Sequence, residues 1–316
     1  MKKIASIIIV LVMLLSFTAC GSSNTPTPPA EQVQNTPATE APAEESIDVP
    51  VEEPPAEDTT AAQEPLPFQE ILVVDNDDCS IKITGIEEDN LWGYTLKALL
   101  ENKTTDKVLM FSVDSAAING VMADPLFASE VAAGKKSNEE ISFNDELLEK
   151  NGINKFTDVE TNFRVYDNED WTADPVAEVT AHVYPYGEEN AEIFARELQP
   201  TDTILADNEY VTVIFTGCED DDIWGYSANL YIVNKTETSI MVSVDEASIN
   251  GFMIDPFYAD TVNAGKVAFS TISWFDTDLE ENSITEVESI EFVLHVYDNE
   301  DWSGDDFYND IVTITP

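Results

Sequence analysis

Alternation of apolar and polar residues dominates the chain from about residue 70 onward. In the stretch "LWGYTLKALLENKT" every second position is apolar, at Trp92, Tyr94, Leu96, Ala98 and Leu100. A period of two predicts a strand with one face on a core. The same spacing returns further along the chain at Trp224, Tyr226, Ala228, Leu230 and Ile232. The sequence therefore predicts one half-buried strand that occurs twice.

Other segments with the strand pattern are "CSIKITG", "KVLMFSVD", "SNEEISF", "TNFRVYD" and "AEVTAHVY". The segments "AAINGVMA" and "ASINGFMI" place Asn-Gly between apolar residues, which is a strong signal for a tight hairpin. One short helix is expected in each half, near residues 144–150 and 277–282. Seven or eight short strands with short connections in roughly 110 residues predict an antiparallel β-sandwich.

The second half of this region repeats the first. Aligning Trp92 with Trp224 gives an offset of 132 residues, which becomes 131 after one deletion beyond "NKT". "VYDNEDW" then matches itself at residues 165–171 and 296–302, and Val165 and Val296 continue an inward face with Phe163 and Leu294. A repeat of this length is long enough to hold its own core. We therefore expect domains at residues 70–185 and 203–316, joined by a linker at 186–202.

Several motifs of the repeat carry a resemblance to a known group of domains. "WGY", "NKT", "MFSVD", "INGVMADP", "AAGKKSNEEISF" and "VYDNEDW" resemble the immunoglobulin-like, telokin-like domains of poorly characterised Gram-positive bacterial lipoproteins. The resemblance implies an all-β fold of two tandem immunoglobulin-like antiparallel β-sandwich domains. It brings no agreed activity or binding residue, so function has to be argued from the sites themselves.

The N-terminus has the features of an export signal. Two lysines precede an apolar run at residues 4–17 that is too short for a comfortable membrane span. The segment "FTACGSS" resembles a lipobox, which implies a signal peptide at residues 1–19 and an acylated Cys20. Acylation would anchor the protein to the extracellular face of the cell membrane, whereas ordinary secretion with an unmodified Cys20 is the alternative.

Residues 20–69 are rich in Pro, Thr, Ala and acidic side chains and contain no Lys or Arg. Such a composition cannot bury enough apolar surface to offset its ordering entropy, so we expect a disordered tether. The whole chain has a formal charge of −49. This charge repels phosphate backbones and anionic headgroups and excludes nucleic acid as a partner. The partners that remain are an unknown surface protein, a glycan or a cell-wall component.

Candidate catalytic residues are sparse. The two histidines, His182 and His295, do not align in the repeat, and Arg164 stands at the position of His295. Cys79 and Cys218 also fall at non-matching positions, so we expect free thiols. No nucleophile elbow, zinc-protease motif or phosphate loop is present. A non-enzymatic protein without a required cofactor is expected.

A carbohydrate-active enzyme is the alternative from another class. Phe127, Phe257 and Tyr258 would be its candidate aromatic platforms for a sugar. The same three residues equally suit a turn that closes the end of the core.

Calcium binding is the most specific site hypothesis. The acidic residues after the repeated "VYDNEDW" strand recur as Asp167, Asp170, Asp174 and Asp298, Asp301, Asp305. Oxygen ligands crowded on one loop suit Ca²⁺, although Trp171 and Trp302 stand where an EF-hand loop needs a ligand. The loops "GIEEDNLWG" and "GCEDDDIWG" could add ligands if they lie at the same end of the sandwich.

The competing interpretation is structural. Asp and Asn side chains would form the turn by accepting backbone N–H bonds, and the Trp would pack at the rim. The sequence thus predicts a membrane-anchored extracellular lipoprotein that acts as a non-enzymatic binding or display module. A Ca²⁺-stabilised adhesion module is the main alternative.

Overall fold

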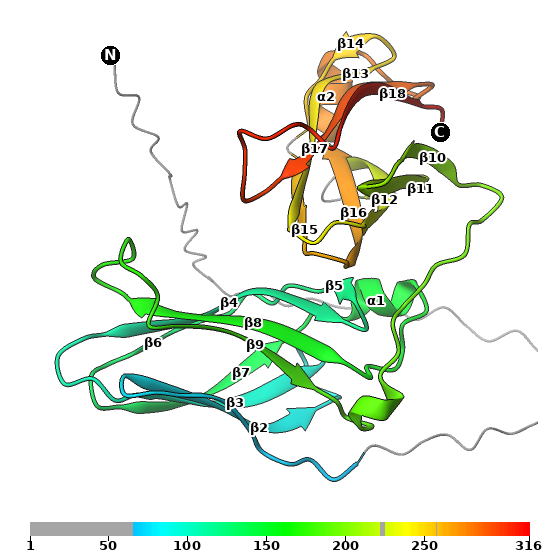
Figure 1. The fold of residues 1–316 in the computed structure, drawn as a ribbon. Helices are drawn as coiled ribbons and strands as arrows, with labels where there is room; N and C mark the ends of the chain where they lie inside the picture. The colour runs from blue at the N-terminus through cyan, green and yellow to red at the C-terminus, as the bar shows by residue number, and fades with distance from the viewer. Residues whose placement is uncertain (1–65, 222–224, 257) are drawn as a thin grey trace, which may run out of the picture. The chain divides into compact units, whose positions relative to one another are not determined.

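The computed structural model describes residues 66–221, 225–256 and 258–316, and its described part consists of two copies of one antiparallel β-sandwich (Figure 1). The all-β prediction is therefore confirmed. The first copy contains β1 (Ile71–Asp75), β2 (Cys79–Glu87), β3 (Thr95–Asn102), β4 (Leu109–Ile118), β5 (Val121–Met122), β6 (Ala128–Val131), β7 (Lys136–Ser142), α1 (Glu146–Lys150), β8 (Val159–Asp167) and β9 (Ala177–Val183).

A single turn of 3-10 helix, η1 (Glu188–Asn190), follows the first copy. The second copy contains β10 (Thr203–Asp207), β11 (Val211–Asp221), β12 (Gly225–Asn234), β13 (Ile240–Ile249), β14 (Phe252–Met253), β15 (Ala259–Val262), β16 (Val267–Trp274), α2 (Asp276–Glu281), β17 (Ile290–Asp298) and β18 (Tyr308–Ile314). The two-residue strands β5 and β14 bring each described copy to nine strands, rather than the expected seven or eight.

Each copy has two layers. In the first copy, β1, β2, β3 and β7 form one sheet, and β5, β4, β8 and β9 form the other, with β6 paired to β4 (Figure 1). The corresponding layers of the second copy are β10-β11-β12-β16 and β14-β13-β17-β18, with β15 paired to β13. A single parallel pairing of Val267 with Val121 also connects β16 to β5. All other strand pairs are antiparallel, as the short connections predicted.

The duplication extends to the hydrogen-bond register. The first two strands of each copy contain an irregularity at the same place, between Leu72 and Val74 and between Ile204 and Ala206. The next strand pair repeats the pattern, with shifts at Ile83/Gly85 and Phe215/Gly217. Bulges are specific local features, so their recurrence shows that the two copies share backbone detail as well as sequence.

The Asn-Gly hairpins are formed as predicted. Asn119 and Gly120 have φ values of 52° and 81°, and Asn250 and Gly251 have 52° and 82°. Two consecutive residues with positive φ define the type I′ turn, whose twist matches that of the flanking strands. The turn connects β4 to β5 in one copy and β13 to β14 in the other.

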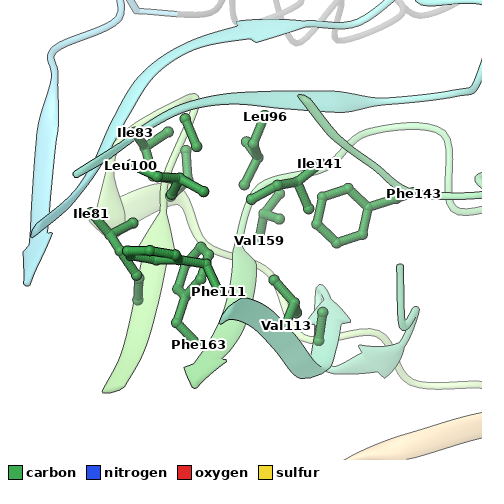
Figure 2. Packing of buried hydrophobic residues seen from close by; sticks show 14 of the residues in the cluster. Ile81, Ile83, Leu96, Leu100, Phe111, Val113, Ile141, Phe143, Val159 and Phe163 are labelled. Carbon is green, nitrogen blue, oxygen red and sulfur yellow. The ribbon is translucent and has the colours of Figure 1, made fainter. Parts of the chain in front are cut away.

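The predicted inward faces form the core. Figure 2 shows Ile83 and Leu96 of one layer above Phe111 and Phe163 of the other. These four side chains are at most 1 % exposed, and Leu294 in the second copy is fully buried. Full burial of such a side chain contributes about 1.5–3 kcal/mol, so the core is the main stabiliser of each sandwich.

The expectation that Trp92 shares this face is wrong, because the side chain is 72 % exposed. The alternation ends at Gly93, whose φ of +93° turns the chain before β3 begins. A Cβ atom at Gly93 would lie 2.2 Å from the carbonyl oxygen of Phe143, so the close approach requires glycine. The matching Trp224 lies outside the described residues.

The two "NKT" segments lead into turns that are held by their asparagine side chains. Asn102 is fully buried, and its Nδ2 donates to the carbonyls of Lys107 and Val131 at 2.9 and 2.7 Å. Its Oδ1 accepts from the backbone and the hydroxyl of Thr104. Asn234 does the same in the second copy. A buried, fully bonded amide is closed to glycan attachment in the folded domain.

Segments next to the predicted boundaries contact the first sandwich. The N–H of Leu66 donates to the carbonyl of Pro185 at 2.9 Å, and Phe68 packs on the core. Phe194, in the expected linker, packs on the same core and donates its N–H to Asn119. The predicted signal peptide and Cys20 lie outside the described residues. Within the described ranges, no helix has the length and apolarity needed to cross a bilayer.

Candidate functional site

The loop between β8 and β9 holds the first set of predicted cation ligands. The Oδ1 of Asp167 accepts the N–H of Glu169 at 3.1 Å, and its Oδ2 lies 3.2 Å from the Lys107 ammonium. These backbone and lysine contacts lower the pKa of Asp167. Asp170 accepts the hydroxyl of Thr172 at 2.8 Å, and Asp174 is exposed. Asp167 therefore forms the turn, as the structural interpretation predicted.

The loop between β17 and β18 repeats this arrangement. Asp298 accepts the N–H of Glu300 at 2.8 Å and the hydroxyl of Thr238 at 3.0 Å. These hydrogen bonds, led by the backbone N–H of Glu300, lower the pKa of Asp298. Asp301 accepts both the N–H and the hydroxyl of Ser303. Asp298, Asp301 and Asp305 line one shallow hollow of about 210 Å³ beside Tyr210 and Phe307.

A metal site requires ligand atoms that converge on one point, which is a stricter condition than lining the same hollow. Within the described part of the chain, the one group of three ligands whose atoms lie within 4.8 Å of one another is Asp158, Glu160 and His182. None of the six predicted aspartates belongs to it. Lys266 Nζ lies 2.5 Å from Glu160 Oε2, so an internal cation already neutralises one of the two carboxylates of this group. Calcium binding by the predicted aspartates thus remains a prediction without a converged ligand set.

The second acidic loop does not assist the first. Glu87, at the end of β2, pairs with Thr95 at the start of β3. The β8–β9 loop lies beyond the other end of β3, where Asn168 donates its N–H to the carbonyl of Val108. In Figure 1 the β8–β9 loop and α1 lie at opposite ends of the first sandwich. In the first sandwich the two acidic loops therefore lie too far apart to ligate one cation together.

Exposed tryptophans are the feature that the sequence interpretation missed. Trp171 is 70 % exposed and Trp302 is 77 % exposed, so neither packs at the rim as expected. The indole N–H of Trp302 donates to the carbonyl of Asn299 at 2.7 Å, which fixes the ring while leaving it open to solvent. The identical "DNEDW" segments were the available signal, but they were assigned to turn formation.

The aromatic residues considered for sugar binding lie elsewhere. Phe127 is partly buried and packs on the first core, and Tyr258 packs on the second and shares a hydrogen bond with Ser270. Phe257 lies outside the described residues. Phe127 and Tyr258 therefore close the ends of the cores, which was the alternative reading of these residues.

The histidines have carboxylate partners, and the cysteines are unreactive thiols. His182 Nδ1 lies 2.8 Å from Asp158, and His295 Nε2 lies 2.8 Å from Asp306. Cys79 and Cys218 are free thiols, as predicted. Burial raises the pKa of Cys79 to about 11 and also raises that of Cys218, so both thiols stay protonated near neutral pH.

A cavity of about 740 Å³ lies between the start of β1 and the end of β9 and is mainly apolar. Its walls include Leu66, Phe68, Ile71, Ile86 and Tyr184. The exposed loops with Trp171 and Trp302 are separate from it. No known family model matches the chain, and comparison with curated proteins gives no significant match.

Proposed function

We propose that the chain is a membrane-anchored extracellular lipoprotein whose two repeats act as a non-enzymatic binding or display module. The lipobox-like segment around Cys20 supports the anchor, and the motifs of the repeat support an immunoglobulin-like family of lipoprotein domains. A protein, a glycan or the cell wall is the partner class.

The observation that carries this proposal is the pair of matching loops with exposed Trp171 and Trp302. A large aromatic side chain that is more than two-thirds exposed loses favourable burial unless a partner covers it. Tryptophan is also enriched among the residues that dominate binding energy at interfaces. Two copies on one chain allow simultaneous contacts, which raise avidity without any new contact.

Anchoring is tested by Cys20→Ala. The variant is expected in the medium and the wild-type protein in the membrane fraction, as measured by immunoblotting of both fractions. Membrane retention of the variant would show that the anchor lies elsewhere.

Binding is tested with full-length protein on isolated bacterial cell walls and intact cells. The double variant Trp171→Ser, Trp302→Ser should lose retention, because both exposed rings are removed. Leu126→Ser is the matched control, since Leu126 is also an exposed apolar residue but lies outside these loops. Equal retention of the double variant and the wild type would refute the role of the tryptophans.

A further inference from the structure

A small polar cavity lies at the end of the first sandwich, where β2 leads into β3 and α1 follows β7. Its volume is about 180 Å³. The cavity is lined by three aromatic rings, four carboxyl groups, one amide and one amine, from Tyr94, Phe156, Tyr186, Glu88, Asp89, Asp145, Glu149, Asn154 and Lys155. This is the end of β3 opposite to the loop that carries Trp171.

The hydroxyl group of Tyr94 is the unusual one among the groups of the cavity-lining residues. The side chain is 5 % exposed, and its buried oxygen has no hydrogen-bond partner among the described residues. Buried polar side-chain atoms are nearly always bonded, so an unpartnered hydroxyl on a cavity wall indicates a missing group. Burial, followed by the nearby charge of Glu88, raises the pKa of Tyr94 well above its usual range. The hydroxyl therefore stays protonated and offers its lone pairs to a donor.

The charge on the wall defines which donor is favoured. Four carboxyl groups share the cavity with a single amine, so negative charge is in surplus. The one amine, Lys155 Nζ, lies 4.1 Å from the centre of the Tyr186 ring, where the ring face attracts it. Asp145 accepts the backbone N–H of Tyr94 at 2.9 Å, which holds the carboxylate at the cavity. A positively charged donor fits this environment.

The second sandwich has a related hollow at the matching place, although there the Tyr226 hydroxyl already has the Cys218 thiol as a partner. Tyr226, Asp220, Asp276 and Glu280 stand at the repeat positions of Tyr94, Glu88, Asp145 and Glu149, and all four line a hollow of about 490 Å³. Glu286 replaces the amine of Lys155, so this wall is more acidic still. Because Glu149 and Glu280 are exposed, core packing does not account for their presence in both copies.

The volume of the cavity and the spacing of its carboxylates limit which class of cation it can bind. The carboxylates of this cavity are absent from the one described set of ligands within 4.8 Å of one another, so they do not form a chelating metal site. A volume of 180 Å³ is below the range of about 300–1,000 Å³ for small-molecule pockets. It suits one ammonium or guanidinium group at the end of a side chain. The net charge of −49 further favours a basic macromolecule over a small ligand.

We propose that the Tyr94 cavity binds a cationic side chain of a basic protein segment. The ammonium or guanidinium group donates to the Tyr94 oxygen and is neutralised by Glu88 and Glu149. This assignment names a partner chemistry for the proposed binding function, on which it rests. It involves neither Trp171 nor Trp302, so the two proposals fail separately.

The test is isothermal titration of the full-length protein with short blocked peptides of lysine, arginine or neutral citrulline. Tyr94→Phe should weaken binding of the cationic peptides about tenfold at this cavity, since a hydrogen bond to a charged group is lost. Glu149→Gln should weaken it about two- to fivefold, as for an exposed ion pair. Glu146→Gln on the same short helix is the control and should bind like the wild type, because Glu146 does not line the cavity.

The competing outcomes are distinct. Unchanged affinity of Tyr94→Phe and Glu149→Gln would overturn the proposal and leave only general attraction by the acidic chain. Citrulline peptides that bind as tightly as the lysine and arginine peptides would overturn it too, because positive charge would then not contribute to binding. Blocked single lysine that binds as tightly as the peptide would overturn the protein segment as partner. Tighter binding of one cationic peptide identifies the group. Loss of cell-wall retention in the Trp double variant, with peptide binding intact, separates the two functions.

Discussion

Tyr94→Phe is expected to stabilise the first sandwich. In the free protein the buried Tyr94 hydroxyl has no partner among the described residues, and an unsatisfied buried group costs about 1–3 kcal/mol. Removing one oxygen leaves a gap of roughly 10–15 Å³, which costs about 0.3 kcal/mol at ~24 cal/mol per Å³. The net gain is about 0.7–2.7 kcal/mol. The same change therefore raises stability while it lowers affinity for a cationic peptide.

The assay is native-state hydrogen exchange on the full-length protein, because slow amides of β3 and β8 report the opening of the first sandwich alone. A gain of about 1.4 kcal/mol slows their exchange tenfold. Tyr226→Phe is the control, read from the slow amides of β12 and β17 in the second sandwich, since the Tyr226 hydroxyl already shares a hydrogen bond with the Cys218 thiol and its removal brings no such gain. Unchanged or faster exchange in Tyr94→Phe would show that the hydroxyl is satisfied in the free protein.

Three other measurements follow from the contacts. Asp202→Asn should lower the unfolding free energy by about 2 kcal/mol at neutral pH, because the covered carboxylate accepts two Arg196 hydrogen bonds, at 2.5 and 2.8 Å. Arg196 lowers the pKa of Asp202, so the stability that the pair contributes is present above the unfolded pKa and is lost as pH falls through the lower folded pKa. Urea titrations at several pH values measure this loss. A difference between wild type and variant that does not change with pH would show that the pair is unimportant. Asn102→Ala should cost about 2–4 kcal/mol, since four buried bonds lose their partner, whereas substitution of exposed Asp106 should change the urea midpoint little. Calcium at millimolar concentration should raise the melting temperature no more than magnesium, and a larger shift that is abolished by Asp298→Asn would restore the calcium hypothesis.

The sequence predicted the regular parts of the fold because their signals are local. The period of two placed Leu96, Ala98 and Leu100 on the core, and Asn119-Gly120 specified its own turn. Trp92 was misassigned because the alternation was continued across Gly93, where a positive φ and the approach of the Phe143 carbonyl end the strand. That carbonyl belongs to Phe143, which directly follows β7 and is remote in sequence, so the pattern alone did not contain the constraint.

The candidate sites were less accessible to sequence reasoning. Acidic residues are so frequent that the sequence did not distinguish the cluster at Asp167 from the cluster at Glu88. Only the strand pairing showed that the two clusters lie beyond opposite ends of β3. The exposure of Trp171 depends on how far its loop extends beyond the sheets. The isolation of the Tyr94 hydroxyl depends on packing against Phe156, whose ring lies 5.0 Å away edge to face. Alignment of Glu149 with Glu280 in the two copies was the one available signal.

Because the two sandwiches resemble each other down to matching bulges, a strand of one copy can pair with the wrong copy during folding. A strand such as β8 meets a similar apolar face in either copy, since β4 pairs with β8 as β13 pairs with β17, although the bulge lies at Val113/Ser115 in one pair and at Asp245/Ser248 in the other. Neighbouring repeats misassemble by exchanging equivalent strands, and chains fold from the N-terminus during synthesis. We therefore expect two features to keep each strand with its own sandwich: the order in which the copies emerge and the different bulges of β4 and β13.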